Sequence, residues 1–259
     1  MQNDAAPVLR AVLGAGEPTG HAQRAHDALQ GLVRAARQHL GMDVSFISEF
    51  TDHERVFRFV DADVEGPVAP GGADPLEASY CQRVVDGRLP GLIRDARQVP
   101  AALELDVTLA LPVGAHVSVP LLLADGRVYG TFCCFSYSAD ESLTERDLAV
   151  VRVFAEVAST YLQADIDASE QLARARARIA SAIDRSGVMA TVYQPVVSTV
   201  DGDIVGVEAL TRFASEEIRA PDVWFAEAES VGLGAQLELA ALRSPLAALD
   251  DLPPGVSWA

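Results

Sequence analysis

A polar Gly/Asp turn between two β-rich runs places the strongest constraint on how this chain can fold. The first run is Tyr193–Val197 and the second is Ile204–Phe213, separated by Ser-Thr-Val-Asp-Gly-Asp. Runs rich in Val, Ile, Thr and aromatic residues on either side of a Gly/Asp turn are typical of a β-hairpin. The spacing therefore predicts two antiparallel strands in this part of the chain.

The second run carries two opposite charges on one face. Side chains alternate between the two faces of a strand, so Glu208 and Arg212 point the same way, as do Ile204 and Leu210. Four residues at the strand rise separate the two charged positions by roughly 13 Å. This separation favours contacts with two parts of one ligand over a direct ion pair.

The hairpin and the residues after it resemble the opening of an EAL domain, the cyclic-di-GMP phosphodiesterase of bacterial signalling. Several elements recur in order and at the family spacing, which makes the resemblance more specific than a Glu-Ala-Leu triplet alone. These elements are Tyr193-Gln194-Pro195-Val196-Val197, Gly206-Val207-Glu208-Ala209-Leu210-Thr211-Arg212-Phe213, Pro221, Phe225, Ala228-Glu229 and Gly232-Leu233.

The EAL resemblance implies a fold, a reaction and a set of site residues. It implies a β/α (TIM-like) barrel that hydrolyses cyclic-di-GMP to the linear dinucleotide with Mg²⁺ or Mn²⁺. Glu208 would be a catalytic residue and a metal ligand, and Arg212 would contact a phosphate. The remaining substrate-binding positions that it implies are Gln194, Pro195 and Leu210.

The EAL-like segment, residues 188–259, is too short for the complete domain. Barrels of this kind need about 200 residues or more, so the resemblance covers only the opening third. The family's other metal ligands and a Lys lie further along, with no counterpart here. Phosphodiester hydrolysis needs two divalent ions, each held by several oxygen ligands. We therefore expect this chain, as a truncated form, to be inactive.

Composition excludes several classes of function. The chain has 259 residues and a net charge of −17, and all 20 of its basic residues are Arg. A strongly acidic chain is a poor binder of DNA or anionic membranes, and a chain without Lys forms no Schiff base. The three cysteines lack zinc spacing, and no apolar run reaches the length of a signal peptide or membrane span. We expect a cytoplasmic protein.

The first half alternates short helical and β-rich patterns. A leader, residues 1–20, lacks periodicity, and residues 65–75 form a Gly/Pro-rich loop. The order of the remaining elements predicts an α+β domain with a mainly antiparallel sheet. These elements are a helix at His21–Leu40, strands at Val44–Phe50 and Arg55–Asp61, a helix at Glu77–Val85, an edge strand at Leu89–Asp95, and a hairpin of His116–Leu123 and Arg127–Phe135.

This first half resembles a GAF domain over residues 21–165. The resemblance rests on Tyr80–Val85, Val119-Pro120-Leu121, Asp125–Thr131 and the helix that follows. GAF domains sense small molecules or light ahead of output domains, which implies a ligand that the sequence does not identify. The candidate lining residues are Phe46, Tyr80, Cys81, Thr131 and Phe132, although core packing explains them equally well.

Cys81 admits three interpretations. It could attach a tetrapyrrole through a thioether, take part in redox chemistry, or fill space as a small buried residue on a short helix. Buried cysteines usually behave as small apolar residues, so the third interpretation is favoured.

A long helical pattern, residues 142–187, connects the two halves. Apolar residues recur at spacings of three and four, from Leu148 through Leu162 and again at Ile179 and Ile183. This pattern is typical of a coiled-coil seam and predicts a signalling helix, with the protein as a homodimer through its helices. The alternative is two helices joined by a linker near Asp165–Ser169.

The sequence thus predicts a GAF sensor that controls an EAL phosphodiesterase in cyclic-di-GMP signalling, with this chain a truncated form. The fold class is an α+β GAF domain joined by a long helix to an incomplete β/α barrel fragment. The alternative is a non-catalytic GAF module for ligand sensing or dimerisation, with a degenerate or incomplete EAL segment.

Overall fold

The computed structural model describes residues 20–63, 66–214, 219–248 and 256–258. The chain divides into two compact units. The N-terminal unit is Glu17–Ile166, and the C-terminal unit contains Asp167–Ala259. Apart from Gly20, the predicted leader lies outside the described residues.

The N-terminal unit is built on a six-stranded sheet in the order β3-β2-β1-β6-β5-β4. Every neighbouring pair in this sheet is antiparallel. The strands are β1 (Val44–Phe50), β2 (Glu54–Ala62), β3 (Ala73–Pro75), β4 (Leu92–Ile93), β5 (Ala115–Leu122) and β6 (Val128–Ser136).

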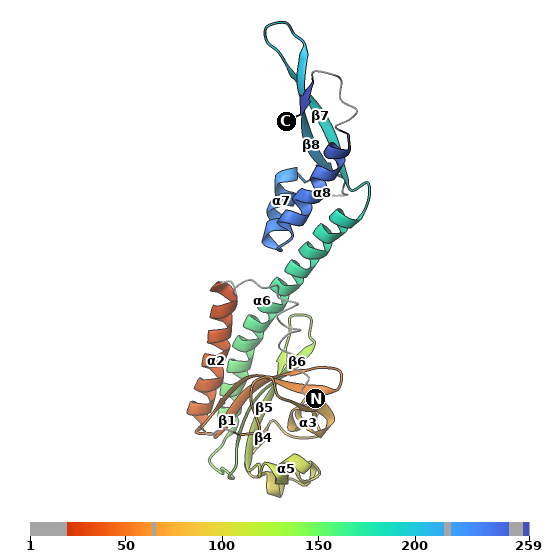
Figure 1. The fold of residues 1–259 in the computed structure, drawn as a ribbon. Coiled ribbons are helices and arrows are strands. Elements are labelled where there is room, and N and C mark those ends of the chain that lie inside the picture. The colour runs from red at the N-terminus through yellow and green to blue at the C-terminus, as the bar shows by residue number, and fades with distance from the viewer. Residues whose placement is uncertain (1–19, 64–65, 215–218, 249–255, 259) are drawn as a thin grey trace. The chain divides into compact units, whose positions relative to one another are not determined.

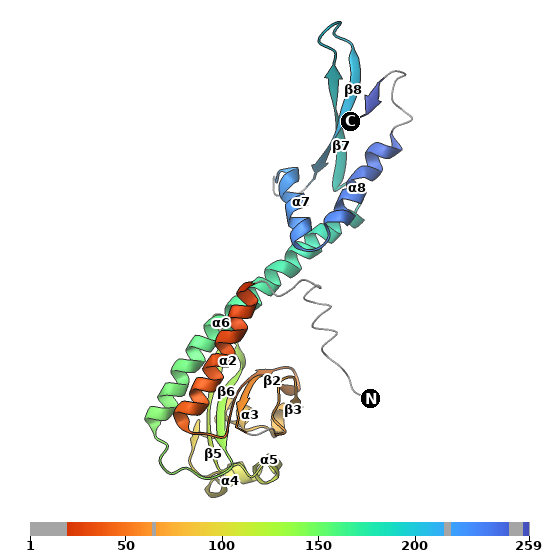
Figure 2. The same cartoon turned by 60° about the vertical axis from the view of Figure 1, so that its left-hand side comes forward.

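Helices cover both faces of this sheet. Figures 1 and 2 show α2 (Gly20–Leu40) beside α6 (Glu145–Asp184) on one face and the short helices on the other. Alternating strand residues supply each face with apolar side chains, so one core forms under α2 and α6 and a second under α3. The short helices are η1 (Leu76–Ala78), α3 (Tyr80–Val85), η2 (Ala96–Gln98), α4 (Pro100–Leu103) and α5 (Asp106–Ala110).

The structure confirms the predicted α+β class and antiparallel sheet, with three local differences. The strand β3 lies inside the predicted loop 65–75, where its pairing with β2 comes from tertiary contact rather than from its sequence. The predicted helix Glu77–Val85 is divided at Ser79, whose extended backbone and side chain cap α3. The short helices α4 and α5 were not expected, because segments of four or five residues carry too little periodicity to recognise.

The helix α6 contributes to the cores of both units. Its start is fixed by Thr144, whose backbone N–H and hydroxyl both donate to the Asp147 carboxylate. The helix is continuous across Asp165–Ser169, as one element rather than the two of the alternative prediction. The first part of the expected coiled-coil seam is buried inside the N-terminal unit, at Leu148, Val151, Ala155, Ala158 and Leu162.

The C-terminal unit contains the predicted hairpin. Strands β7 (Met189–Val197) and β8 (Ile204–Phe213) pair antiparallel, and β9 (Ser257–Trp258) pairs parallel to β8. Two helices, α7 (Pro221–Ser230) and α8 (Gly234–Ala247), lie between β8 and β9 in the chain. The described strands form a mixed three-stranded sheet.

The core of the C-terminal unit packs against one face of the hairpin. The ring of Phe213 on β8 stacks on Trp224 of α7, with 4.7 Å between ring centroids and 8° between planes. Ile179 and Ala182 of α6 are buried in the same core. The end of α6 is therefore a structural part of this unit.

Within the described ranges, no helix has the length and apolar character needed to cross a membrane.

Candidate functional site

A group of polar side chains is buried between the sheet of the N-terminal unit and α3. Its members come from five elements, β1, β2, β5, β6 and α3. Six of them are linked by contacts of hydrogen-bond length, and the other two, Tyr80 and His116, pack against each other, with the charge of Arg55 acting on His116. We refer to this set as the Arg55–Cys81 cluster. It consists of Ser48, Arg55, Tyr80, Cys81, His116, Ser118, Thr131 and Cys133.

Arg55 on β2 is the charged member of the cluster. Its Nη1 donates to the Sγ of Cys81 at 3.0 Å, and its Nε donates to Asp74, its cross-strand partner on β3, at 2.9 Å. The guanidinium also lies over the rings of Phe46 and Phe57, 5.5 and 4.8 Å from their centroids. Burial opposes the charge, but the neighbouring Cys81 and Asp74 outweigh it and raise the pKa of Arg55.

Two cysteines meet beside Arg55. The Sγ of Cys81 lies 3.1 Å from the Sγ of Cys133, which is also 2.9 Å from the Ser118 hydroxyl and 3.1 Å from the Thr131 hydroxyl. Burial disfavours the Cys81 thiolate, but the hydrogen bond from Cys133 and the charge of Arg55 prevail and lower the pKa of Cys81. Burial raises the pKa of Cys133. The arrangement favours a thiolate at Cys81 and a thiol at Cys133.

His116 and Tyr80 form the neutral side of the cluster. Their rings lie 4.7 Å apart, and the Tyr80 hydroxyl is 2.6 Å from the Thr108 hydroxyl. Burial, together with the charge of Arg55, lowers the pKa of His116 to about 3, so this imidazole is neutral near pH 7. Among the described residues, the buried Nδ1 of His116 has no hydrogen-bond partner.

The structure brings together four of the five predicted pocket residues. Phe46, Tyr80, Cys81 and Thr131 lie on the α3 side of the sheet. Phe132 lies on the opposite face, in the core under α2 and α6, because neighbouring residues of β6 alternate between faces. It does not join the other four.

Sequence reasoning missed the polar partners of Cys81. Arg55, Asp74 and His116 come from segments far apart in the chain, and no spacing in the sequence connects them with Cys81. A buried arginine on a strand is hard to predict from sequence. The alternation of apolar and polar residues indicates which face of the strand a side chain lies on, but it does not indicate which residue neutralises its charge. Cys133 and Cys134 face opposite sides of the sheet, Cys133 in the core under α3 and Cys134 in the core under α2 and α6.

A second group of predicted site residues lies on the hairpin. In the register of β7 and β8, Gln194 is opposite Glu208, and Leu210 and Arg212 follow on the same face. Pro195 is opposite Val207 on the other face, so the structure does not group it with these four. Glu208 and Arg212 are both exposed, and Arg212 donates to the carbonyl of Thr211 at 2.9 Å.

The hairpin does not supply a complete metal site. Within the part of the chain that the structure describes, no three His, Cys, Asp or Glu side chains are grouped to hold a metal ion. Glu208 alone provides too few oxygen ligands for a divalent pair. The described residues therefore do not fit the two-metal centre that the EAL resemblance implies.

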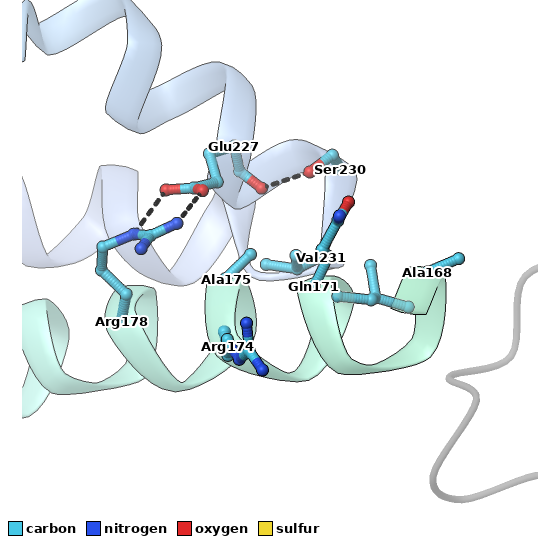
Figure 3. Close-up of a pocket in the computed structure, with 9 residues that line it drawn as sticks. Ala168, Gln171, Arg174, Ala175, Arg178, Glu227, Ser230 and Val231 are labelled. Carbon is cyan, nitrogen blue, oxygen red and sulfur yellow. Dashed lines mark hydrogen bonds and ion pairs between the residues drawn. The ribbon is translucent and has the colours of Figure 1, made fainter. Parts of the chain in front are cut away.

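A groove of about 510 Å³ lies within the C-terminal unit, between α6 and α7. Figure 3 shows Arg178 of α6 bonded through two nitrogens to the Glu227 carboxylate, beside Ala175, Gln171 and Val231. The hydrogen bond from Arg178 lowers the pKa of Glu227, assisted by a second one from Arg219. The groove therefore lies beside the polar contacts that fasten α6 to α7.

Comparison with known proteins identifies the N-terminal unit. The model of the GAF domain family matches residues 24–162. No curated protein is a significant match to the chain.

Solved structures give distant matches that span most of their own length. The blue-light absorbing form of the PixJ GAF domain from Thermosynechococcus elongatus is 14% identical, with 61% of this chain and 96% of that chain covered and a TM-score of 0.48. The GAF-B domain of DevS from Mycobacterium smegmatis is 20% identical, with 60% and 98% covered and a TM-score of 0.40. The family model covers more than half of the 259 residues, and this chain therefore belongs to the GAF domain family.

Proposed function

We propose that this chain is the sensory part of a bacterial cyclic-di-GMP signalling protein. In this proposal the GAF domain senses a small molecule in the cytoplasm and controls an EAL phosphodiesterase that begins in residues 188–259. The observation that carries the proposal is the shared face of β7 and β8. Gln194, Glu208, Leu210 and Arg212 lie there together, and the opposite face packs on helices.

The order of elements after the hairpin supports this proposal. The strand β8 is followed by two helices and then by β9, which pairs with β8 in parallel. A strand, a helical crossover and a parallel strand form the repeating unit of a β/α barrel. The face that carries Glu208 would point toward the inside of such a barrel.

The chemistry assigns different tasks to the two charged residues. In a complete domain, Mg²⁺ or Mn²⁺ would activate water and stabilise the oxygens of the phosphodiester. Glu208 would be one of several ligands to that metal, and Arg212 would hold a phosphate through its guanidinium fork. Gln194 and Leu210 would contact the nucleotide from the same face.

Coupling between sensor and output would run through α6. Arg178 pairs with Glu227, and Arg176 donates to the carbonyl of Val231 at 2.8 Å, so the end of α6 is bonded to α7.

We also propose a homodimer through the helices. The apolar residues Val153, Val157 and Tyr161 recur every four positions on α6 and are 59%, 41% and 38% exposed.

The decisive experiment measures cyclic-di-GMP hydrolysis by the complete product of the gene in Mg²⁺ and in Mn²⁺. The expected result is linear dinucleotide from the wild type and about a hundredfold less from Glu208→Gln, because a metal ligand is lost. Glu238→Gln is the matched control, since Glu238 is an exposed glutamate on α8. Equal activity of the two variants, or no activity with either metal, would reject the proposal.

A non-catalytic role is the second candidate, and one observation favours it. Within the described residues, Glu208 belongs to no group of three or more His, Cys, Asp or Glu side chains that could hold a metal ion. In that case the hairpin face would serve as a nucleotide receptor or as an inactive remnant. Calorimetric titration of this 259-residue chain with cyclic-di-GMP distinguishes the receptor from the remnant. A receptor binds the dinucleotide without hydrolysing it, and a remnant does not bind it.

A further inference from the structure

The Arg55–Cys81 cluster has the parts of a thiol redox centre, and we propose that Cys81 and Cys133 form a disulfide when the GAF domain meets a small hydroperoxide such as hydrogen peroxide. Cys81 would be the attacking thiolate and Cys133 the resolving thiol. The proposal concerns the N-terminal unit and does not depend on the phosphodiesterase assignment.

The position of the two sulfurs is the first argument. They lie 3.1 Å apart on α3 and β6, so an approach of about 1 Å would reach the length of a disulfide bond. The two cysteines are separated by 52 positions in the chain, so this contact is made by the fold rather than by local sequence. No large movement of either element is needed to join them.

The polarity of the pair is the second argument. Arg55 donates to Cys81, whereas the partners of Cys133 other than Cys81 are the neutral hydroxyls of Ser118 and Thr131. A thiolate beside a guanidinium is the reactive form of cysteine. The lowered pKa of Cys81 and the raised pKa of Cys133 agree with this division of roles.

The burial of the centre selects the oxidant. Cys81 and Cys133 are both 0% exposed, and Arg55 is 6% exposed. A small neutral molecule can reach such a site through brief local openings of the structure. A bulky molecule would need a larger opening, and a charged one would have to give up its hydration. Hydrogen peroxide is both small and neutral.

The reaction balances with hydrogen peroxide alone. The Cys81 thiolate attacks one peroxide oxygen, the O–O bond breaks, and hydroxide leaves and takes up the proton that Cys81 had released. Cys81 is then a sulfenic acid. Cys133 gives up its proton and attacks the Cys81 sulfur, the S–O bond breaks, and hydroxide leaves as water with that proton. Two thiols are oxidised, and the peroxide is reduced to two waters.

Oxidation would change the surroundings of Arg55. A disulfide carries no charge, so Arg55 would lose one of its two anionic partners and retain Asp74 on the edge strand β3. The bond would also tie α3 to the centre of the sheet at β6. Both changes occur on the face of the sheet that carries the predicted ligand residues.

The test treats the folded chain with hydrogen peroxide, blocks the remaining thiols and maps the peptides by mass spectrometry. Because the chain is cut after Arg, Cys133 and Cys134 fall in one tryptic peptide, residues 128–146. Cys134→Ser removes this ambiguity, and it is also the matched control, since Cys134 lies on the other face and contacts Ser45. The expected product is a cross-link between peptides 59–83 and 128–146 that has lost two hydrogens and forms at the wild-type rate in Cys134→Ser.

A second variant captures the intermediate. In Cys133→Ser, the Cys81 sulfenic acid has no resolving thiol. Dimedone present in excess while the peroxide-treated chain is unfolded in urea should label Cys81 at least tenfold more than Cys134. Equal labelling of the two residues would overturn the proposal. So would a peroxide-treated chain that keeps its native circular dichroism but shows no link between Cys81 and Cys133.

Discussion

Arg178 on α6 and Glu227 on α7 form a two-point ion pair, in which the guanidinium Nε lies 3.1 Å from one carboxylate oxygen and Nη2 contacts the other. Glu227 also accepts a bond from Arg219 at 2.9 Å. One carboxylate therefore holds two arginines from different segments of the C-terminal unit.

Replacing this carboxylate should weaken the C-terminal unit. We expect Glu227→Gln to lower the free energy of unfolding by about 1–2 kcal/mol, because the three hydrogen bonds from Arg178 and Arg219 lose their charged acceptor and the amide replaces it poorly. Both tryptophans, Trp224 and Trp258, belong to this unit, so their fluorescence during urea denaturation reports its unfolding. Glu238→Gln should change stability by less than about 0.5 kcal/mol, and equal effects of the two variants would contradict the role of Glu227.

The buried His116 should make the N-terminal unit sensitive to acid. Its pKa is lowered to about 3 in the folded state and returns to about 6.5 on unfolding. The unfolded state therefore binds more protons between these values, so the stability that His116 contributes is complete above about pH 6.5 and is lost as the pH falls. The slope is up to about 1.4 kcal/mol per pH unit.

The matched variant isolates this effect from that of the carboxylates. Between pH 7.5 and pH 5, the wild type should lose about 2 kcal/mol more stability than His116→Gln, which has no ionisable imidazole. Urea denaturation followed by circular dichroism at the two pH values measures the difference. A parallel loss in both proteins would show that His116 does not carry the sensitivity.

Gly130 on β6 should tolerate no side chain. A Cβ at this position would lie 1.9 Å from the carbonyl oxygen of Ser48 on the neighbouring strand β1. We expect Gly130→Ala to destabilise the N-terminal unit by more than about 2 kcal/mol, because backbone must shift to admit the methyl group.

A second glycine provides the control for Gly130. A Cβ at Gly31, inside α2, would meet nothing within 4 Å. Gly31→Ala should raise stability by about 0.5–1 kcal/mol, since alanine favours the helix. Thermal unfolding of the two variants is expected to shift in opposite directions, and a harmless Gly130→Ala would argue against the close approach of β1 and β6.

The homodimer can be tested on the exposed side of α6. Val157→Glu places a charge in the middle of the stripe formed by Val153, Val157 and Tyr161, and should convert a dimer to a monomer in sedimentation equilibrium. Leu109→Glu is the control, because Leu109 is 70% exposed on the short helix α5. A wild type that is monomeric at high concentration would exclude this interface.

The parts of the fold that the sequence predicted are those with local periodicity. The hairpin of β7 and β8 and the helix α2 follow from alternation, helical spacing and turn residues. The turn at Asp125-Gly126 was also predictable from the sequence. Gly126 adopts a φ of +84°, which few residues other than glycine accept, so the turn requires a glycine at this position. In each case the residues that form the sequence pattern are the same neighbouring residues that form the element, so a short stretch of sequence is enough to predict it.

The candidate site was less accessible to sequence reasoning. The sequence predicts Cys81 as a candidate pocket residue. It does not predict the residues that determine the chemistry of Cys81, because Arg55 and Cys133 come from β2 and β6. A hydrogen bond between residues 26 positions apart has no periodic signature. The face of the sheet on which Phe132 lies could not be predicted for a related reason. The strand β6 is buried on both sides, so its sequence shows no alternation of apolar and polar residues.

The burial of all three native cysteines has a practical consequence. A new cysteine at an exposed position would react with spin labels or dyes far faster than the buried thiols. One such reporter on α2 and another on α8 would let pulsed electron resonance measure the distance between the N-terminal and C-terminal units in solution. The same doubly labelled protein, before and after peroxide, would show whether oxidation of the GAF domain changes that distance.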